Sequence, residues 1–202
     1  MRKYIIEFIG TFFLVLIIAL TGNPLAIGAG VVGLVYFGGY ISGAHYNPAV
    51  TLALWMSKKI KSYIAIRYML TQLLAAITAS AFYYLITYKT FTPHFGPGVS
   101  MTSALIIEVL FTFLLCSVVL HAAATDKTKD NDYFGLAIGL TVMAGAFAAG
   151  PISGAAFNPA VGVGPLLYDF GNLASHTTEL LTYIIGPFLG GSIASIVYKN
   201  KL

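Results

Sequence analysis

The sequence predicts an all-α membrane protein with six membrane-spanning helices and two shorter helices that enter the bilayer without crossing it. Three observations predict this fold. The chain has 202 residues, of which 58% are hydrophobic and only 9% are charged, whereas a soluble domain carries roughly 25% charged residues. Six apolar stretches are long enough to span a bilayer. A ten-residue motif occurs once in each half of the chain, which indicates an inverted repeat.

The shortage of charge excludes several classes of protein. A mean hydropathy of +0.85 argues against a disordered chain, a nucleic-acid-binding domain and an ordinary cytosolic enzyme. The single cysteine, Cys116, excludes an intramolecular disulfide and a cysteine-based metal cluster. The 21 glycines agree with helices that pack closely in lipid.

The first elements to place are the membrane spans, since a helix needs about 20 apolar residues to cross a bilayer core of about 30 Å. The stretches that qualify are Tyr4–Thr21, Leu25–Ser42, Ser62–Thr87, Met101–Ala122, Tyr133–Gly150 and Thr177–Tyr198. Two further apolar stretches, Ala49–Met56 and Ala160–Tyr168, are too short to cross. The first span runs into a Gly-Asn-Pro turn, which argues against a cleaved signal peptide.

The basic residues predict the orientation. If the two short segments do not cross, ten of the eleven lysines and arginines share a side with both termini, and only Lys89 lies opposite. The positive-inside rule makes the shared side cytoplasmic. We therefore expect a multi-pass protein of the cell membrane (plasma or inner) with both termini cytoplasmic. The basic pI of about 9.1 then follows from topology and contact with anionic lipid, with no role for nucleic acid.

The chain is expected to form one domain, 1–202, made of two related halves, about 1–88 and about 101–202. The motifs Ile41–Val50 and Ile152–Val161 share eight of ten residues, and a ninth position exchanges tyrosine for phenylalanine. A span containing Glu-x-x-x-Thr-Phe precedes each motif, at Glu7 and Glu108. Because each half holds three spans, the second half is inverted relative to the first. Inverted repeats place their site near the bilayer midplane, on discontinuous helices.

The Asn-Pro-Ala sequences within the motifs predict two half-helices. Asparagine is a preferred N-cap and proline is favoured at the first helical position. The residues concerned are Asn47, Pro48, Ala49, Asn158, Pro159 and Ala160. Inversion brings the two helix N-termini together at the midplane, each with a partial positive charge of about half a unit.

A polar track is expected on either side of these N-termini. If each asparagine oxygen caps its own helix, the amide NH₂ points at whatever passes. Non-helical backbone at membrane depth is tolerated only beside protein or a water-filled cavity, so the preceding segments should line a path. The segments supply Gly43, Ala44, His45, Gly154 and Ala156. Together these features predict a pore for small neutral solutes that form hydrogen bonds.

At these residues the chain resembles the major intrinsic protein family, the aquaporins and aquaglyceroporins. The resemblance covers essentially the whole chain, including Glu7–Phe12, Ser42–Val50, Gln72 and the Gly186–Gly191 segment. It implies an aquaporin-like right-handed bundle of six helices and two half-helices, with a pore in each subunit of a homotetramer. It also implies passive conduction of water, glycerol, urea or neutral metalloid acids, with no cofactor, no metal and no enzymatic activity.

One position departs from the family pattern. The second family motif normally continues with an arginine of the selectivity filter, and Val161 stands there in this chain. By resemblance the other three filter positions are Ile27, Ala146 and Ala155. We expect a wide, apolar filter that passes solutes larger than water, although an apolar constriction can also lose its water and close. A channel mainly for water remains an alternative.

The remaining polar residues leave other functions open. Glu7 and Glu108 are intramembrane acids, which suits either proton coupling or a scaffold that accepts hydrogen bonds from the loop backbone; their duplication favours the scaffold. His45 either lines the pore or supports its loop. Competing functions are a secondary active transporter, which would use the two acids, and a non-conducting adhesive protein. No metal-ligand spacing connects the histidines, and no nucleophile constellation indicates an enzyme.

Overall fold

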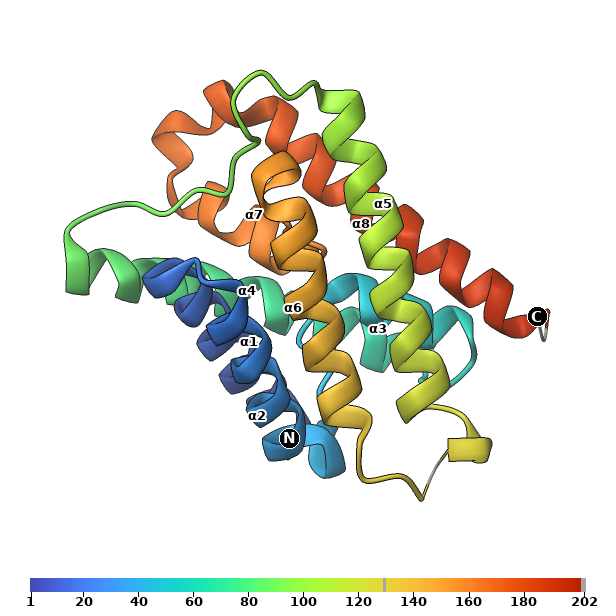
Figure 1. Cartoon of the computed structure of the whole chain (residues 1–202). Helices are drawn as coiled ribbons and strands as arrows, with labels where there is room; N and C mark the ends of the chain where they lie inside the picture. The colour runs from blue at the N-terminus through green and yellow to red at the C-terminus, as the bar shows by residue number, and fades with distance from the viewer. Residues whose placement is uncertain (129, 201–202) are drawn as a thin grey trace.

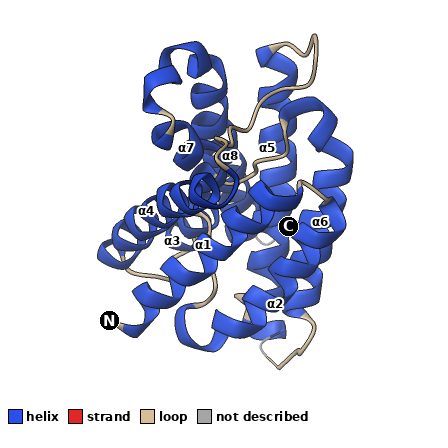
Figure 2. Ribbon diagram, turned by 90° about the vertical axis from the view of Figure 1, so that its left-hand side faces the viewer, coloured by secondary structure: helices blue, strands red, loops and turns tan. Residues whose placement is uncertain are grey.

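A computed structural model describes residues 1–128 and 130–200, in which helices are joined by short loops (Figure 1). The long helices are α1 (Arg2–Thr21), α2 (Pro24–Ser42), α4 (Ser62–Thr87), α5 (Met101–Val118), α6 (Phe134–Ser153) and α8 (Thr177–Lys199). Two shorter helices are α3 (Pro48–Met56) and α7 (Pro159–Tyr168). No residue that the structure describes lies in a strand (Figure 2).

Six helices are long and apolar enough to cross a membrane, which confirms the all-α class and the number of spans. Helices α3 and α7 have 9 and 10 residues, or about 14–15 Å at 1.5 Å per residue, roughly half of a bilayer core. Two basic residues used for the topology, Lys129 and Lys201, lie outside the described residues.

Two helix ends differ from the sequence prediction. Helix α6 continues past Gly150 and Pro151 to Ser153 and ends at Gly154, whose φ of 78° is left-handed. Glycine reaches this conformation without strain. The residue that ends the helix is therefore Gly154, four residues beyond Gly150. Helix α5 continues as a π-helix, Val119–Ala123.

The connector between the halves, of which residues 124–128 and 130–133 are described, is attached to this π-helix. The hydroxyl of Thr128 donates a hydrogen bond to the carbonyl oxygen of His121 (2.7 Å), and Asn131 Nδ2 donates to the carbonyl oxygen of Ala122 (2.7 Å). In Figure 1 the connector lies at the lower side of the molecule, and the 88–100 loop between α4 and α5 runs along the upper side. We refer to these as the connector end and the loop end.

The two halves interlock. Helix α3 of the first half packs against α8 of the second, and α7 of the second half packs against α4 of the first. Helix α2 packs against α6 across the same divide. This exchange of partners is the packing expected for an inverted repeat, and it brings the two half-helices to the centre of the molecule.

Glycines allow the closest of these contacts. A Cβ added at Gly190 of α8 would lie 2.5 Å from the carbonyl oxygen of Val109 and 2.8 Å from the nitrogen of Phe113, both backbone atoms of α5. Gly28 of α2 and Gly139 of α6 face each other in the same way, each within 3 Å of the other's carbonyl oxygen. Small residues at helix contacts let backbones approach in lipid.

Replacing Gly164 with alanine should destabilise the fold by about 1–3 kcal/mol, the usual cost of overpacking. A Cβ at this position of α7 would overlap the Cβ of Ala76 on α4. The matched control is Gly33→Ala on α2, where the added Cβ meets no atom within 4 Å and helix propensity favours alanine by up to about 1 kcal/mol. Thermal unfolding in detergent measures both; equal midpoints for the two variants would contradict this packing.

Candidate functional site

The site is built around the N-termini of α3 and α7. Oδ1 of Asn47 accepts hydrogen bonds from the backbone nitrogens of Ala49 (2.8 Å) and Val50 (3.4 Å). Oδ1 of Asn158 accepts from the nitrogen of Ala160 (2.9 Å). Both asparagines therefore cap their half-helices, with proline as the first helical residue in each case.

The amide groups of the two asparagines also join the halves to each other. Asn47 Nδ2 donates to the carbonyl oxygen of Phe157, and Asn158 Nδ2 donates to that of Tyr46, each at 2.9 Å. An amide NH₂ has two hydrogens, so one hydrogen per asparagine remains for the path. The sequence-based expectation that the whole NH₂ is available was wrong, because the loop of the opposite half takes up one of its hydrogens.

Left-handed backbone before each half-helix turns these carbonyls toward the partner loop. In the first loop Gly43, Ala44 and Tyr46 have φ values of 88°, 48° and 49°. The second loop repeats the pattern at Gly154, Ala155 and Phe157, with 78°, 52° and 48°. Non-glycine residues pay about 1–3 kcal/mol for such a conformation, so the surroundings must hold the loops in place.

Two buried glutamates provide this support. Glu7 accepts hydrogen bonds from Ser42 Oγ (2.7 Å), from the backbone nitrogens of His45 (3.0 Å) and Tyr46 (2.8 Å), and from Gln72 Nε2 (2.8 Å). Its side chain is 0% exposed. A carboxylate with four donors is fully engaged in holding the loop.

Glu108 does the same for the second loop. It accepts from Ser153 Oγ (2.7 Å) and from the backbone nitrogens of Ala156 (3.0 Å) and Phe157 (2.7 Å), and it is also 0% exposed. The symmetric placement of both acids behind the loops favours the scaffold interpretation over proton coupling.

A cavity of about 480 Å³ runs past the half-helix tips. At the loop end it is lined by Gly22, Pro24 and residues 90–94, and at the connector end by Val35, Val119 and Ile138. A second cavity of about 230 Å³ shares Val35, Ala44, Val119 and Ile138 with the first and continues toward the connector. Together the linings of the two cavities extend from the loop end of the molecule toward the connector end.

The sequence-predicted residues fall into two groups. Those that line the large cavity are Ile27, Ala44, His45, Asn47, Ala146, Gly154, Ala155, Ala156, Asn158 and Val161, while Gly43 lines the second one. The residues that do not line the large cavity are Glu7, Pro48, Ala49, Glu108, Pro159 and Ala160; they are buried and shape the loops and helix starts instead.

Sequence reasoning missed two parts of the lining. One is an apolar wall from the long helices, made of Leu14, Ile18, Val31, Leu34, Val35, Leu115, Val119, Ile138 and Val142. Such residues have the same sequence pattern as ordinary core positions, so no signal distinguished them. The other is the segment 90–94 of the 88–100 loop, whose threonines and histidine, Thr90, Thr92 and His94, are at the loop end of the cavity.

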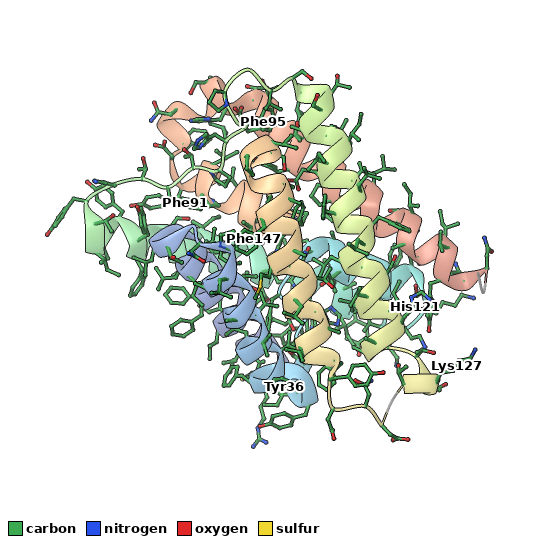
Figure 3. The ribbon with its side chains drawn as sticks, viewed as in Figure 1. Tyr36, Phe91, Phe95, His121, Lys127 and Phe147 are labelled. Carbon is green, nitrogen blue, oxygen red and sulfur yellow. The ribbon has the colours of Figure 1, made fainter. Side chains whose placement is uncertain are left out.

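The 88–100 loop is held over this end of the cavity by α6. The backbone nitrogen of Gly96 donates to the carbonyl oxygen of Ile152 (2.9 Å), and the ring of Phe95 packs edge-on against Tyr183 of α8, with centroids 5.9 Å apart. Figure 3 shows Phe91 and Phe95 at the loop end, remote from His121 and Lys127 at the other end of α5.

The groups that line the cavity suit the passage of a small solute. Two amide donors and two helix N-termini lie at its centre, non-helical backbone lies on one side, and apolar side chains lie on the other. Within residues 1–128 and 130–200, no group of three His, Cys, Asp or Glu side chains is placed to hold a metal ion.

Comparison with known proteins agrees with this geometry. The profile of the family described as "Major intrinsic protein" matches residues 1–198 of the chain. The chain belongs to the major intrinsic protein family. Members of this family are channels and not enzymes, so the chain is a passive membrane channel.

Several relatives align with almost the whole length of this chain. "Glycerol uptake facilitator protein-like 6" of Lactiplantibacillus plantarum is 35% identical over 216 residues, which include 96% of this chain and 95% of that protein. "Aquaporin NIP1-4" of Oryza sativa is 35% identical and covers 98% of this chain, which spans 76% of its length. Among solved structures, the aquaglyceroporin from Plasmodium falciparum has the same fold, with a TM-score of 0.84 over 98% of this chain and 94% of that one, at 22% identity.

Proposed function

We propose that this major intrinsic protein conducts neutral solutes larger than water, such as glycerol, urea and undissociated arsenous acid, together with water. One observation carries the proposal. The residue that follows the second Asn-Pro-Ala sequence, Val161, lines the cavity together with Ile27, Ala146 and Ala155, so that all four filter positions are apolar.

The physical effect of valine at this position is a wider and less selective entrance. An arginine side chain would bring five hydrogen-bond donors and a permanent charge, and isopropyl brings neither. Ala146 and Ala155 add only methyl groups. The half-helix N-termini remain at the centre, and their partial positive charges raise the energy of a passing cation.

The cavity lining has an apolar side and a polar side, which suits solutes that also have apolar and polar parts. Glycerol has a carbon chain that can face the apolar wall and hydroxyl groups that can meet the asparagine donors and the loop carbonyls. The name of the Lactiplantibacillus plantarum relative refers to glycerol uptake, which supports the same solute class for this chain. The name of the Oryza sativa relative is that of an aquaporin, which supports water as a co-permeant.

The second candidate function is a secondary active transporter. It would need an ion site along the path, and the two intramembrane acids are the groups available for it. Glu7 and Glu108 do not line the large cavity, and their oxygens are bonded to loop donors, so a passive channel fits better. Uptake that saturates at low solute concentration and follows a proton or sodium gradient would favour the transporter.

We further propose that the channel lies in the cell membrane as a homotetramer with both termini cytoplasmic. Apolar side chains are exposed along the outer faces of the long helices, including Phe13, Leu70 and Phe147, and lipid or a neighbouring subunit would cover them. Native mass spectrometry of the protein in detergent tests the assembly, and a mass other than four chains would contradict it.

The experiment that tests the proposed function is stopped-flow light scattering with purified protein in liposomes. Water, glycerol, urea and arsenous acid are compared at equal osmotic gradients, with protein-free liposomes as the background. We expect all four permeabilities to rise above background. Passage of water alone would contradict the wide filter. Passage of nothing would contradict the proposed conduction and would instead indicate a filter that loses its water and closes.

A further inference from the structure

A group of cations lies on the surface of the first half, where α1 packs against α4. The guanidinium carbon Cζ of Arg67 is 6.0 Å from the centre of the Tyr4 ring and 5.8 Å from that of the Tyr63 ring. Nζ of Lys3 is 5.4 Å from the centre of the same Tyr4 ring. Two cations therefore share one aromatic ring. We call Lys3, Tyr4, Tyr63 and Arg67 the α1–α4 cation cluster.

The topology of the chain does not account for the arginine of this cluster. The lysines within residues 58–61 precede α4, whereas Arg67 is the sixth residue of the helix. It is exposed and shares a helical stripe with Tyr63, Leu70 and Leu74, which are 53%, 63% and 58% exposed. This stripe is apolar apart from Arg67, so lipid covers it. An arginine on a lipid-facing stripe is costly unless it has a partner.

The depth of Arg67 brings its side chain to the level of the lipid headgroups. Helix α4 has 26 residues, or about 39 Å at 1.5 Å per residue, which exceeds a bilayer core of about 30 Å by about 4–5 Å at each end. Arg67 lies about 7–8 Å from the first residue of the helix, so its backbone is about 3 Å inside the core. A side chain of this length reaches from there to the phosphates.

No acidic side chain of the described residues neutralises the cluster. Glu7 is the only acid within residues 1–107, and its oxygens accept hydrogen bonds from the first loop. Helix α4 packs against α1, α3 and α7, and the three acids of the connector lie on none of these helices. No carboxylate oxygen of the described residues is within 4.0 Å of the Arg67 nitrogens. Two like charges beside one ring repel each other, so we expect an anion from the surroundings to balance them.

The second half has no equivalent cluster. Tyr183 takes the place of Tyr68, because both phenols donate to the backbone carbonyl that ends the preceding span. The residue before Tyr183, in the place of the arginine, is Thr182, which is uncharged and 0% exposed. Counted from the two glutamates, Ala104 takes the place of Lys3. The cations therefore serve only the end of the molecule where the connector lies, and the repeat does not explain them.

We propose that the α1–α4 cation cluster binds the phosphate of an anionic phospholipid, whose acyl chain lies along Leu70 and Leu74. The guanidinium fork of Arg67 matches the geometry of a phosphate, and Lys3 adds a second positive charge. Tyrosines such as those of the cluster are enriched at the headgroup level. A lipid fits this place better than a dissolved anion, because its chain also covers the apolar stripe beside the cations.

Trp55 makes this site observable. It is the only tryptophan of the chain, it is 41% exposed, and its Nε1 donates to Ser62 Oγ at the start of α4 (2.9 Å). Lipids with brominated acyl chains quench tryptophan fluorescence on contact. The unmodified protein is reconstituted in phosphatidylcholine that contains a minor fraction of brominated phosphatidylglycerol or, for comparison, of brominated phosphatidylcholine with the same chains. We expect stronger quenching by the phosphatidylglycerol.

Substitutions in the cluster test whether it causes this preference. Arg67→Leu should lower the affinity for phosphatidylglycerol relative to phosphatidylcholine about fivefold, the value of one cation near an anionic headgroup. Lys3→Ala should lower it as well, and Arg67→Lys, which keeps the charge without the fork, should retain part of it. Lys127→Ala is the matched control, since it removes an exposed cation from the connector at the same end of the molecule. It should leave the preference unchanged.

Four results would overturn the inference. Equal quenching by the two lipids excludes a preference, and an unchanged preference in Arg67→Leu excludes the cluster as its cause. Quenching by neither lipid shows that a second copy of the chain covers this face. Loss of the preference on addition of millimolar inorganic phosphate assigns the site to a dissolved anion. If Arg67→Leu does not fold, Arg67→Lys and Lys3→Ala decide in its place. The experiment measures no solute flux, so its failure is distinct from a failure of the proposed function.

Discussion

Replacing Glu108 with leucine should destabilise the protein by at least about 3 kcal/mol, since each buried donor left without a partner costs about 1–3 kcal/mol. The substitution removes the acceptor for the backbone nitrogens of Ala156 and Phe157 and for Ser153 Oγ. The two backbone nitrogens belong to a loop with left-handed residues, so no carbonyl oxygen of a helix replaces Glu108 as their hydrogen-bond acceptor. For a chain of this length the unfolding midpoint should fall by about 6–12 °C.

Thermal unfolding in detergent measures this loss, and two further variants show what causes it. Glu108→Gln keeps an oxygen acceptor and should lose less stability than the leucine variant. Glu179→Leu, in the first turn of α8, is the matched control for removing a glutamate and should change stability by less than about 1 kcal/mol. If Glu108→Leu unfolds at the same temperature as the unmodified protein, Glu108 is not a scaffold.

Replacing Val161 with arginine should lower glycerol and urea permeability relative to water by about tenfold or more, equivalent to a barrier increase of about 1.4 kcal/mol. Val161 lines the cavity with only 3% of its surface exposed, and Ala146 and Ala155 in the same lining carry only methyl groups. The long side chain would narrow the path, and its charge would bind water and solute oxygens.

Val161→Met separates size from charge in this experiment. Methionine narrows the path without adding a donor or a charge, so we expect a smaller loss of glycerol permeability than with arginine. Water permeability measured on the same liposomes shows that each variant is folded and inserted. Unchanged glycerol uptake in the arginine variant would show that residue 161 does not limit the opening.

Much of this fold was predictable because lipid places strict demands on sequence. A span must be about 20 residues long and apolar, so the six long helices and the two short ones followed from the hydrophobic pattern. Asparagine and proline at Asn47-Pro48 and Asn158-Pro159 fixed the starts of α3 and α7 through capping preferences that act within four residues. The duplicated glutamates indicated a symmetric support, and the structure provides their donors.

The parts that were not predictable depend on contacts between distant segments. The bonds from Asn47 to the Phe157 carbonyl and from Asn158 to the Tyr46 carbonyl join residues more than 100 positions apart, and no local pattern encodes them. The apolar wall of the cavity has the composition of any helix core. The position of residues 90–94 at the loop end follows from the backbone hydrogen bond between Gly96 and Ile152. Neither sequence segment has a pattern that predicts this bond.

In the proposed channel, glycerol and water share one path past Val161. The reflection coefficient of glycerol, measured by stopped-flow light scattering of proteoliposomes against sucrose as the impermeant reference, tests it most directly. A shared path predicts a glycerol coefficient clearly below that of sucrose in the unmodified protein, and a return toward the sucrose value in Val161→Arg. A glycerol coefficient equal to that of sucrose in the unmodified protein would contradict a shared path.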